Sequence, residues 1–246
     1  MSAIEGRNAV IEALRAGVPL SRVTIAEGTR PDRALDEIVS RAEEAGIAVE
    51  RAPKRVLDAK SERGAHQGVI AEARPYKYAS LDDLLVRAEG KSASLVIALD
   101  HVTDPGNLGA VVRTAEVVGA DGVLVANRRA AAVTPAAYKA SAGALSHVLL
   151  AQEANLVRSL VRCKEAGFWI VGASEHADQT VWEGPLEGRL VLVMGSEGEG
   201  LARLTRETCD FLVRLPQAGR VGSLNVAQAT TAIAYEWVRR SAVARG

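Results

Sequence analysis

Three segments of this chain combine glycines with polar side chains of the kinds that bind and orient a polar ligand. We call residues 100–115 the first block, residues 193–201 the second block and residues 215–227 the third block. Guanidinium, carboxylate, amide and hydroxyl groups can bind a polar ligand through hydrogen bonds, and glycines let a ligand approach the bare backbone. The side chains with this potential are Asn107, Arg113, Glu197, Ser223 and Asn225.

The first block is a turn-rich loop that leads into a helix predicted over residues 108–118. Its glycines, Gly106 and Gly109, do not have the Gly-x-Gly-x-x-Gly spacing of a dinucleotide-binding loop. The chain also contains neither a P-loop nor a Gly-x-Ser-x-Gly nucleophile elbow. Taken alone, Asn107 would suit a helix N-cap.

The apolar residues of the predicted helix fall on one stripe, which places Arg113 on the opposite face. A helix that packs on a core meets solvent or a ligand on that face. An exposed Arg on a helix is usually a solubilising charge, and this interpretation is favoured for Arg113 taken alone. The stripe consists of Leu108, Val111, Val112, Ala115 and Val118.

The second block follows an apolar run and contains Gly195, Gly198 and Gly200 around Glu197. A plain turn needs one glycine, so three of them indicate that something lies against bare backbone. The local pattern does not decide between Glu197 as a ligand to a polar group and Glu197 as a carboxylate at a helix start.

The third block ends in a helix predicted over residues 226–239. Ser223 and Asn225 both suit its N-cap. The core stripe of this helix is formed by Val226, Ala229, Ile233 and Trp237.

Five apolar runs have the length and composition of strands that are buried on both faces of a sheet. Helical patterns separate them, notably over residues 108–118, 155–166 and 226–239. This alternation predicts an α/β domain with a mostly parallel sheet over residues 94–246. The predicted strands are residues 95–99, 122–125, 168–172, 190–194 and 211–213.

The preceding part of the chain predicts a smaller α/β unit over residues 1–75, joined by a linker at residues 76–93. Within the smaller unit, a helix is predicted from Asp32 to Ala45, because Asp32 suits its start and Gly46 suits its left-handed end.

Composition limits the class of protein. The chain is 48% apolar, has no run long enough to cross a bilayer and starts without an export pattern, so we expect a cytoplasmic protein. Cys163 and Cys209 have no neighbouring ligands at zinc spacing, which predicts buried thiols and no metal site. Lys plus Arg equals Asp plus Glu at 30 each, so the net charge argues weakly against a polyanionic partner.

Together, the three blocks resemble the three motifs of the SpoU class of SPOUT methyltransferases. The resemblance rests on Asn107 with Arg113, on residues 195–200 and on residues 223–225, and it covers residues 94–246.

The smaller unit has a resemblance of its own. Residues 6–14 and 66–69 are similar to a small substrate-binding domain related to ribosomal protein L30e. In 23S rRNA guanosine 2'-O-methyltransferases such a domain precedes the catalytic one.

The resemblance implies an α/β-knot fold, in which the C-terminal segment threads a loop to form a deep trefoil knot. It implies S-adenosylmethionine as cofactor, methyl transfer to a ribose 2'-hydroxyl of structured RNA, and no metal. It also implies a homodimer formed through the C-terminal domain, with Tyr235 and Trp237 as interface candidates. The implied cofactor-binding residues are Met194, Gly195, Gly200, Leu215 and Leu224.

Arg113 is the residue that the resemblance links most closely to catalysis. It would act either as a phosphate clamp that orients the hydroxyl or as a general base. The clamp is favoured because guanidinium groups stay protonated in proteins. Glu197, Ser223 and Asn225 would position Arg113 and the ribose, and Asn107 would shape the pocket.

The implied partner is RNA, with a guanosine of 23S rRNA as the expected target and the smaller unit holding the RNA. A tRNA ribose methyltransferase would share all three motifs, and a non-catalytic RNA-binding or ribosome-assembly protein is a second alternative. Each candidate RNA contact is equally interpretable as ordinary surface charge. These candidates are Arg7, Arg51, Lys54, Arg55, His66, Arg128 and Lys139.

Overall fold

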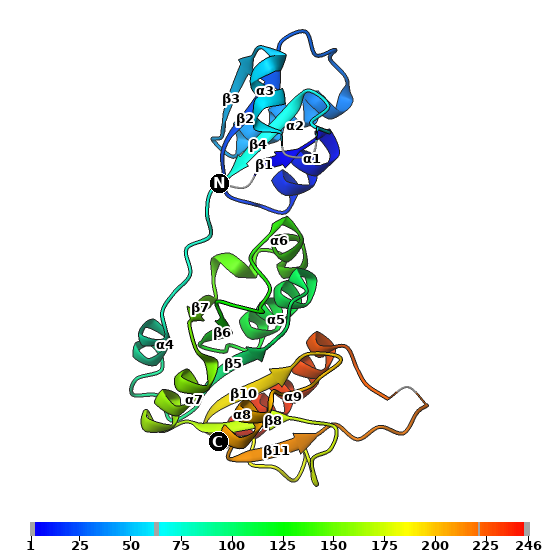
Figure 1. Cartoon of the computed structure of the whole chain (residues 1–246). Helices are drawn as coiled ribbons and strands as arrows, with labels where there is room; N and C mark the ends of the chain where they lie inside the picture. Colours follow the sequence, from blue (N-terminus) through cyan, green and yellow to red (C-terminus); the bar gives the residue numbers. More distant parts are fainter. Residues whose placement is uncertain (1–2, 62–63, 221, 244–246) are drawn as a thin grey trace. The chain divides into compact units, whose positions relative to one another are not determined.

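The computed structural model describes residues 3–61, 64–220 and 222–243, with side chains as far as residue 241. The chain forms two compact units, Met1–Lys77 and Tyr78–Gly246, each built on its own sheet (Figure 1). The remaining residues of the predicted domains, 1–2, 62–63, 221 and 244–246, lie outside the described part of the chain.

The first unit is a four-stranded mixed sheet packed with helices. Its second strand in sheet order, β4, runs antiparallel to both neighbours, whereas β2 and β3 are parallel because α2 makes the crossover between them. In sheet order the strands are β1 (Ala3–Glu5), β4 (Val69–Ala73), β2 (Leu20–Ala26) and β3 (Ala48–Ala52), and the helices are α1 (Arg7–Arg15), α2 (Arg33–Glu44) and α3 (Lys54–Lys60).

The ends of α2 confirm the helix predicted from Asp32 to Ala45. The Asp32 carboxylate accepts a hydrogen bond from the Leu35 N–H at 2.9 Å, which caps the first turn. Gly46 has a φ of 65°, the left-handed conformation that a helix end favours.

The second unit is built on a seven-stranded sheet in which every described strand pair is parallel. The five predicted strands are present, and the α/β class with a mostly parallel sheet is confirmed. The strands β7 and β9 were not predicted. In sheet order the strands are β7 (Leu149–Glu153), β6 (Gly122–Ala126), β5 (Ser94–Asp100), β10 (Arg189–Gly195), β8 (Trp169–Ala173), β11 (Phe211–Arg214) and β9 (Gln179–Thr180).

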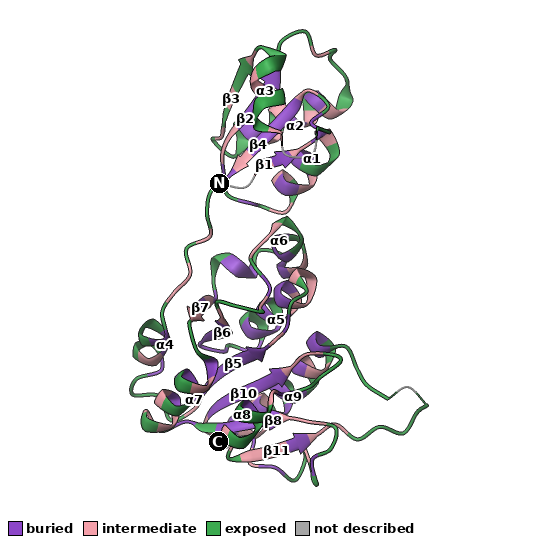
Figure 2. Cartoon of the chain, in the orientation of Figure 1, coloured by how far each residue is buried: buried purple, intermediate pink, exposed green. Residues whose placement is uncertain are grey.

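Helices cover this sheet and bury its central strands, as Figure 2 shows for β5 and β10. Val96 and Ala98 of β5 face a core to which Leu156 and Leu160 of α7 contribute. The alternate residues of β5 face the opposite side. The helices α5 and α9 pack together, with the Thr114 and Thr231 hydroxyl oxygens 2.7 Å apart. The helices are α4 (Leu81–Arg87), α5 (Pro105–Val117), α6 (Pro135–Ser141), α7 (Leu156–Glu165), α8 (Arg203–Thr208) and α9 (Val226–Val243).

The structure differs from the sequence expectation at residues 76–93, which were expected to form a linker outside the core. Leu81 and Leu84 of α4 are fully buried in the core of the second unit. The backbone of Ala79 also bridges to Ala151 in β7. The short acidic segment is amphipathic, so its two leucines anchor it to the sheet although its exposed face has the composition of a linker.

The two cysteines are free thiols. Cys163 is fully buried and Cys209 is half-buried. Burial raises the pKa of the Cys163 thiol to about 11 and that of the Cys209 thiol to about 12. Both are therefore protonated at neutral pH and unreactive as nucleophiles.

No helix formed by the described residues is both long and apolar enough to cross a membrane. No group of three or more His, Cys, Asp or Glu side chains among them is arranged to hold a metal ion.

Candidate functional site

The three blocks leave the sheet of the second unit at one edge. Asp100 at the end of β5 pairs in register with Gly195 at the end of β10. Because the strands are parallel, the loops that follow β5, β10 and β11 all start from the carboxyl edge of the sheet. Open parallel sheets hold their ligands at this edge.

One side chain from each block joins a hydrogen-bonded group that we call the amide–carboxylate triangle, formed by Asn107, Glu197 and Asn225. Asn107 Nδ2 donates to Glu197 Oε1 at 3.0 Å. Asn225 Nδ2 donates to the same carboxylate oxygen at 2.7 Å and to Asn107 Oδ1 at 2.8 Å. The three blocks are therefore in direct contact, although up to 118 positions separate their members in sequence.

The orientation of the Asn225 amide follows from its other contact. Its Oδ1 accepts a hydrogen bond from the Ala227 N–H at 2.9 Å, which only the oxygen can do, so Nδ2 faces the triangle. The Asn225 carbonyl accepts from the Ala229 N–H at 2.9 Å. Asn225 is thus the N-cap of α9 as well as a member of the triangle, and Ser223 is not the cap.

The N-cap interpretation of Asn107 was wrong, because Asp104 caps α5. The Asp104 carboxylate accepts a hydrogen bond from the Asn107 backbone N–H at 2.7 Å. The helix starts at Pro105, a residue that favours the first helical position. This cap leaves the Asn107 side chain available for the triangle.

The three glycines of the second block differ in whether the loop could accept a side chain at their positions. A Cβ atom on Gly195 would lie 2.2 Å from the carbonyl carbon of Gly200, so Gly195 lets the loop fold back on itself. Gly200 has a φ of 65°, where a side chain would be strained. Gly198 has neither constraint, since a Cβ there would meet open space. Neither backbone conformation nor a close contact within the loop therefore requires a glycine at position 198.

A cavity of about 250 Å³ lies beside this loop. Apolar residues such as Val213 and Ile233 form part of its wall, and polar residues form the rest. Ser223 and Glu197 line it. So do all the residues predicted to hold the cofactor, namely Met194, Gly195, Gly200, Leu215 and Leu224.

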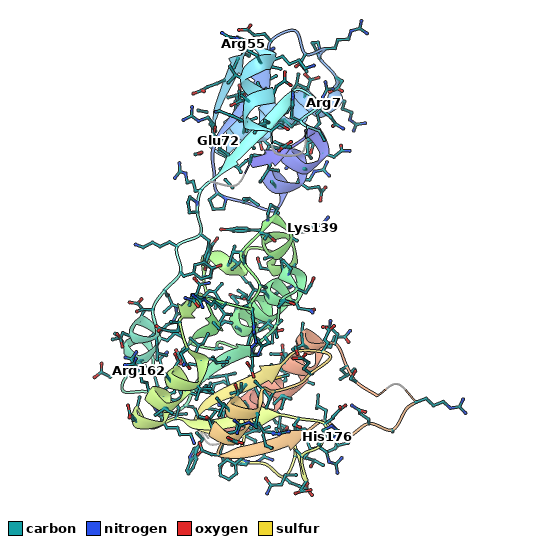
Figure 3. All side chains as sticks on the ribbon, in the orientation of Figure 1. Arg7, Arg55, Glu72, Lys139, Arg162 and His176 are labelled. Atoms are coloured by element: carbon teal, nitrogen blue, oxygen red, sulfur yellow. The ribbon has the colours of Figure 1, made fainter. Side chains whose placement is uncertain are left out.

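Sequence reasoning missed one side of the cavity. Part of this side follows β8, whose apolar run ends at the same carboxyl edge, so the direction of the strands was a usable signal. His176 in the segment after β8 is labelled in Figure 3. The missed lining residues with polar side chains include Ser174, Glu175, His176, Arg206, Arg214 and Gln217.

Arg113 lies on the exposed face of α5, opposite the buried stripe, as the helix phase predicted. It does not line the cavity of its own chain. Among the described residues it forms no hydrogen bond or ion pair. The structure thus brings Asn107, Glu197, Ser223 and Asn225 together and leaves Arg113 outside this group.

A buried carboxylate joins the first block to the end of the second. Asp100 Oδ2 accepts a hydrogen bond from the Ala202 N–H at 2.7 Å. Its Oδ1 lies 2.7 Å from His101 Nδ1, and His101 has a left-handed φ of 59°. The sequence pattern gave no signal for this contact, because it depends on the register of β5 and β10.

The basic residues of β3 and α3 separate into paired and unpaired ones. Three cations, Arg51, Lys54 and Arg55, are exposed, and no hydrogen bond or ion pair of their side chains occurs within the described part of the chain. Arg55 is labelled in Figure 3. The nearby acids are occupied elsewhere, since Glu50 lies 3.2 Å from Arg22 and Asp58 lies 2.9 Å from His66. We call Arg51, Lys54 and Arg55 the basic cluster.

Two other candidates of the first unit have local partners. His66 is buried, with Nε2 2.9 Å from Asp58 Oδ1 and Nδ1 accepting from the Gly68 N–H at 3.0 Å. Both of its ring nitrogens are therefore engaged within the unit. Arg7 forms an ion pair with Asp32.

The two candidates of the second unit are exposed. Arg128 lies in the loop after β6, and Lys139 lies on α6 (Figure 3).

Comparison with known proteins gives two family matches and related chains. Residues 94–235 match the SpoU rRNA Methylase family, and residues 3–79 match a family described as RNA 2'-O ribose methyltransferase substrate binding. An uncharacterized tRNA/rRNA methyltransferase of Mycolicibacterium vanbaalenii is 42% identical over 236 residues, which cover 96% of this chain and 75% of that protein.

Two further comparisons cover nearly the whole chain. YacO of Bacillus subtilis, a putative TrmH family tRNA/rRNA methyltransferase, is 42% identical over 238 residues, covering 96% of this chain and 94% of that protein. The crystal structure of the SpoU methyltransferase AviRb from Streptomyces viridochromogenes, in complex with AdoMet, matches with a TM-score of 0.64 and 27% identity. It covers 96% of this chain and 89% of AviRb. With a family match over more than half of its length, the chain belongs to the SpoU rRNA methylase family.

Proposed function

We propose that this protein transfers a methyl group from S-adenosylmethionine to a ribose 2'-hydroxyl of structured RNA. The observation that carries the proposal is the amide–carboxylate triangle, which joins the three blocks beside the cavity. The match of residues 3–79 to an RNA 2'-O ribose methyltransferase substrate-binding family supports the ribose as acceptor.

The chemistry of the cavity lining suits S-adenosylmethionine. Val226 and Ile233 offer apolar surface for an adenine ring, and open backbone at Gly198 allows close approach. The related AviRb was crystallised with this cofactor. The sulfonium group, when bound, supplies an activated methyl, so the protein has to bind, align and help deprotonate the hydroxyl.

Arg113 would hold a phosphate of the RNA and orient the hydroxyl. A guanidinium is a permanent cation and a bidentate donor, which suits this role better than that of a general base. Glu197, Asn225 and Asn107 would keep the loops of the site in register through the triangle, and Ser223 would face the reacting groups from the wall of the cavity.

We further propose that two copies of the chain form a homodimer in which Arg113 serves the site of the partner subunit. The basis is that Arg113 lies outside its own cavity, on a helix that packs against α9. Val117 and Tyr235 on these helices are 59% and 50% exposed, so apolar surface is available there. Trp237 is only 4% exposed and donates to the Gly188 carbonyl at 3.0 Å, so it belongs to the core and not to the interface.

The proposal extends to the topology and to the first unit. The segment between β11 and α9 would form the trefoil knot of the family. The order β5-β10-β8-β11, in which a late strand enters the middle of the sheet, is compatible with it. The first unit would be an L30e-like domain that holds RNA through the basic cluster, with His66 acting as a support for its loop. A cytoplasmic location fits an RNA substrate.

For the target we propose a guanosine of 23S rRNA, with tRNA as the second candidate because the relatives are named tRNA/rRNA methyltransferases. The protein should be incubated with labelled S-adenosylmethionine and either unmodified 23S rRNA or unmodified tRNA. Primer extension then maps any 2'-O-methyl stop. Label in tRNA alone would contradict the 23S rRNA assignment while leaving the chemistry intact.

The role of Arg113 is tested by Arg113→Ala. We expect loss of methyl transfer together with weaker RNA binding. Glu116→Ala, on an exposed position of the same helix, is the matched control. Full methyl transfer by Arg113→Ala with unchanged RNA affinity would show that this residue has no role in the site.

A further inference from the structure

The cavity beside the second block is lined by six side chains that can carry charge, and three of them already have partners. Glu197 accepts two amide hydrogen bonds in the triangle. Glu175 lies 3.6 Å from His176. The side chains of Glu199, Arg206 and Arg214 have no hydrogen bond or ion pair to any described residue.

Arg214 is the more informative of the two arginines. It is half-buried at the end of β11, beside the fully buried Val213. One electrostatic neighbour is Glu183, whose pKa is lowered chiefly by hydrogen bonds from Thr180 and to a lesser extent by Arg214. The Glu183 carboxylate is itself occupied, because its Oε2 accepts from the Thr180 N–H and hydroxyl at 2.9 and 2.8 Å. Arg214 therefore has a cationic group without a bonded anion in a partly desolvated wall.

A guanidinium in such a place indicates an anionic ligand group. Arginine cannot lose its proton in a protein, so it cannot lower the cost of burial by becoming neutral. A buried charge is compensated by a partner, and an Arg matches a carboxylate through two parallel hydrogen bonds. Arg206 of α8 brings a second guanidinium to the same cavity.

We infer that Arg206 and Arg214 bind the carboxylate at the amino-acid end of S-adenosylmethionine. The inference rests on the proposed function, in which this cavity holds the cofactor. An RNA phosphate could also attract two arginines. We favour the cofactor carboxylate, because both arginines line the same cavity as Gly195 and Leu224, two of the residues proposed to hold the cofactor. The amino-acid end of the cofactor would thus be held by side chains, whereas its adenosine end meets backbone and apolar groups.

The test compares two ligands that differ in this end alone. S-adenosylhomocysteine carries the carboxylate, and 5'-methylthioadenosine has the same adenosine and thioether without the amino acid. Titration calorimetry gives both dissociation constants for the full-length wild type and for Arg206→Ala, Arg214→Ala and the double variant. Arg203→Ala is the control, since Arg203 lies on the same helix but pairs with Glu207 at 2.7 Å and does not line the cavity.

We expect the double variant to bind S-adenosylhomocysteine roughly 10- to 100-fold more weakly, the range for charge-assisted hydrogen bonds. Its affinity for 5'-methylthioadenosine should stay within about 2-fold, as should both affinities of Arg203→Ala. Each single variant should lose part of the effect, and lysine at either position should restore part of the affinity because it keeps the charge. Thermal unfolding of each variant verifies that the fold is intact.

Several results would overturn the inference. Equal losses for both ligands would mean that the arginines only shape the cavity. Unchanged affinity for both ligands, together with weaker RNA binding, would assign the arginines to an RNA phosphate. Equal affinity of the wild type for the two ligands would show that the amino-acid end contributes nothing. A wild type that binds neither ligand would instead contradict the proposed function itself.

Discussion

The amide–carboxylate triangle of the second unit and the basic cluster of the first unit differ in whether their polar side chains have bonded partners within the chain. In the second unit, the polar side chains of three distant blocks bond to one another in the amide–carboxylate triangle. In the first unit, the acids near the basic cluster are bonded elsewhere, so Arg51, Lys54 and Arg55 stay exposed without a described partner. The hydrogen bonds of the triangle fix the positions of its side chains, whereas the cations of the basic cluster stay available for the RNA that we propose they bind.

The comparison also explains why residue type alone is a poor guide to role. His66 and Lys54 line the same part of the first unit and both suit an RNA contact by type. The structure engages both ring nitrogens of His66 and leaves Lys54 exposed. On this basis His66 is a supporting residue, and Lys54 is one of those that we propose to contact RNA.

The largest expected effect comes from breaking the triangle. Glu197→Ala removes the acceptor of two amide hydrogen bonds and lets the three loops shift. We expect methyl transfer to fall by roughly 10²-fold, the loss typical of a small misplacement of reacting groups. Single-turnover rates with labelled S-adenosylmethionine and saturating RNA measure this.

Glu197→Gln is the matched control for the triangle, because its amide oxygen can still accept a hydrogen bond. It should retain more activity than the alanine variant. If the alanine variant reacted at the wild-type rate, the hydrogen bonds of the amide–carboxylate triangle would not be needed for methyl transfer.

The proposed role of the basic cluster in RNA binding is tested by replacing its three residues with alanine. The triple variant Arg51→Ala, Lys54→Ala, Arg55→Ala should bind RNA about 10-fold or more weakly. The slope of the logarithm of the binding constant against the logarithm of the salt concentration should become less steep, by the amount expected for the loss of about three phosphate contacts. Filter binding at several salt concentrations measures both quantities. Lys60→Ala is the control, since Lys60 pairs with Glu72 at 2.7 Å and should have a smaller effect. If the triple variant kept the salt dependence of the wild type, the basic cluster would not contact RNA phosphates.

Within the second block, alanine substitutions at Gly195 and Gly198 should separate an effect on stability from an effect on ligand binding. Gly195→Ala should lower the free energy of unfolding by about 1–3 kcal/mol, because its Cβ would overlap the backbone of Gly200. Gly198→Ala should change it by no more than about 0.5 kcal/mol, yet weaken binding of S-adenosylhomocysteine. Urea unfolding and calorimetry separate the two effects. Equal destabilisation by both variants would mean that Gly198 serves the loop and not the ligand.

The smallest effect concerns another internally bonded acid, Glu236 of α9. Its hydrogen bonds with Arg239 and Arg240 lower its pKa to about 2, from an ordinary value of 4.5. The folded state therefore binds fewer protons here than the unfolded state, and the stabilisation is present above pH 4.5 and lost as the pH falls towards 2.

This pH dependence is measured by comparing wild type with Glu236→Gln. The difference in their urea midpoints should be constant from neutral pH down to about pH 4.5 and should shrink below it. A difference that stayed constant through this window would show that the ion pairs of Glu236 contribute nothing to stability.

Much of the second unit could be predicted from the sequence, because its strands are short apolar runs buried on both faces and its helices carry clear stripes. The exposed position of Arg113 followed from the phase of one helix. The direction of a parallel sheet also made it predictable that the three blocks leave at one edge.

The contacts that depend on register or on partners far along the chain were not predictable. The pattern around Asn107 gave no means of choosing between a cap and a link to Glu197, since the choice depends on Asp104 taking the cap. No sequence motif distinguishes Arg206 and Arg214 from ordinary surface charges, and only the fold shows that both line one cavity. Likewise, α4 resembled a linker because only two of its residues are fully buried.

The central claim is that this chain methylates a ribose 2'-hydroxyl in RNA, and the direct measurement is the chemical form of the product. The protein is incubated with S-adenosylmethionine that carries a labelled methyl group and with unmodified rRNA, and the RNA is digested to nucleosides for mass spectrometry. We predict label in a 2'-O-methylated nucleoside, and none in the reaction of Glu197→Ala at early times. Label on a base, or no label in any RNA offered, would contradict the account.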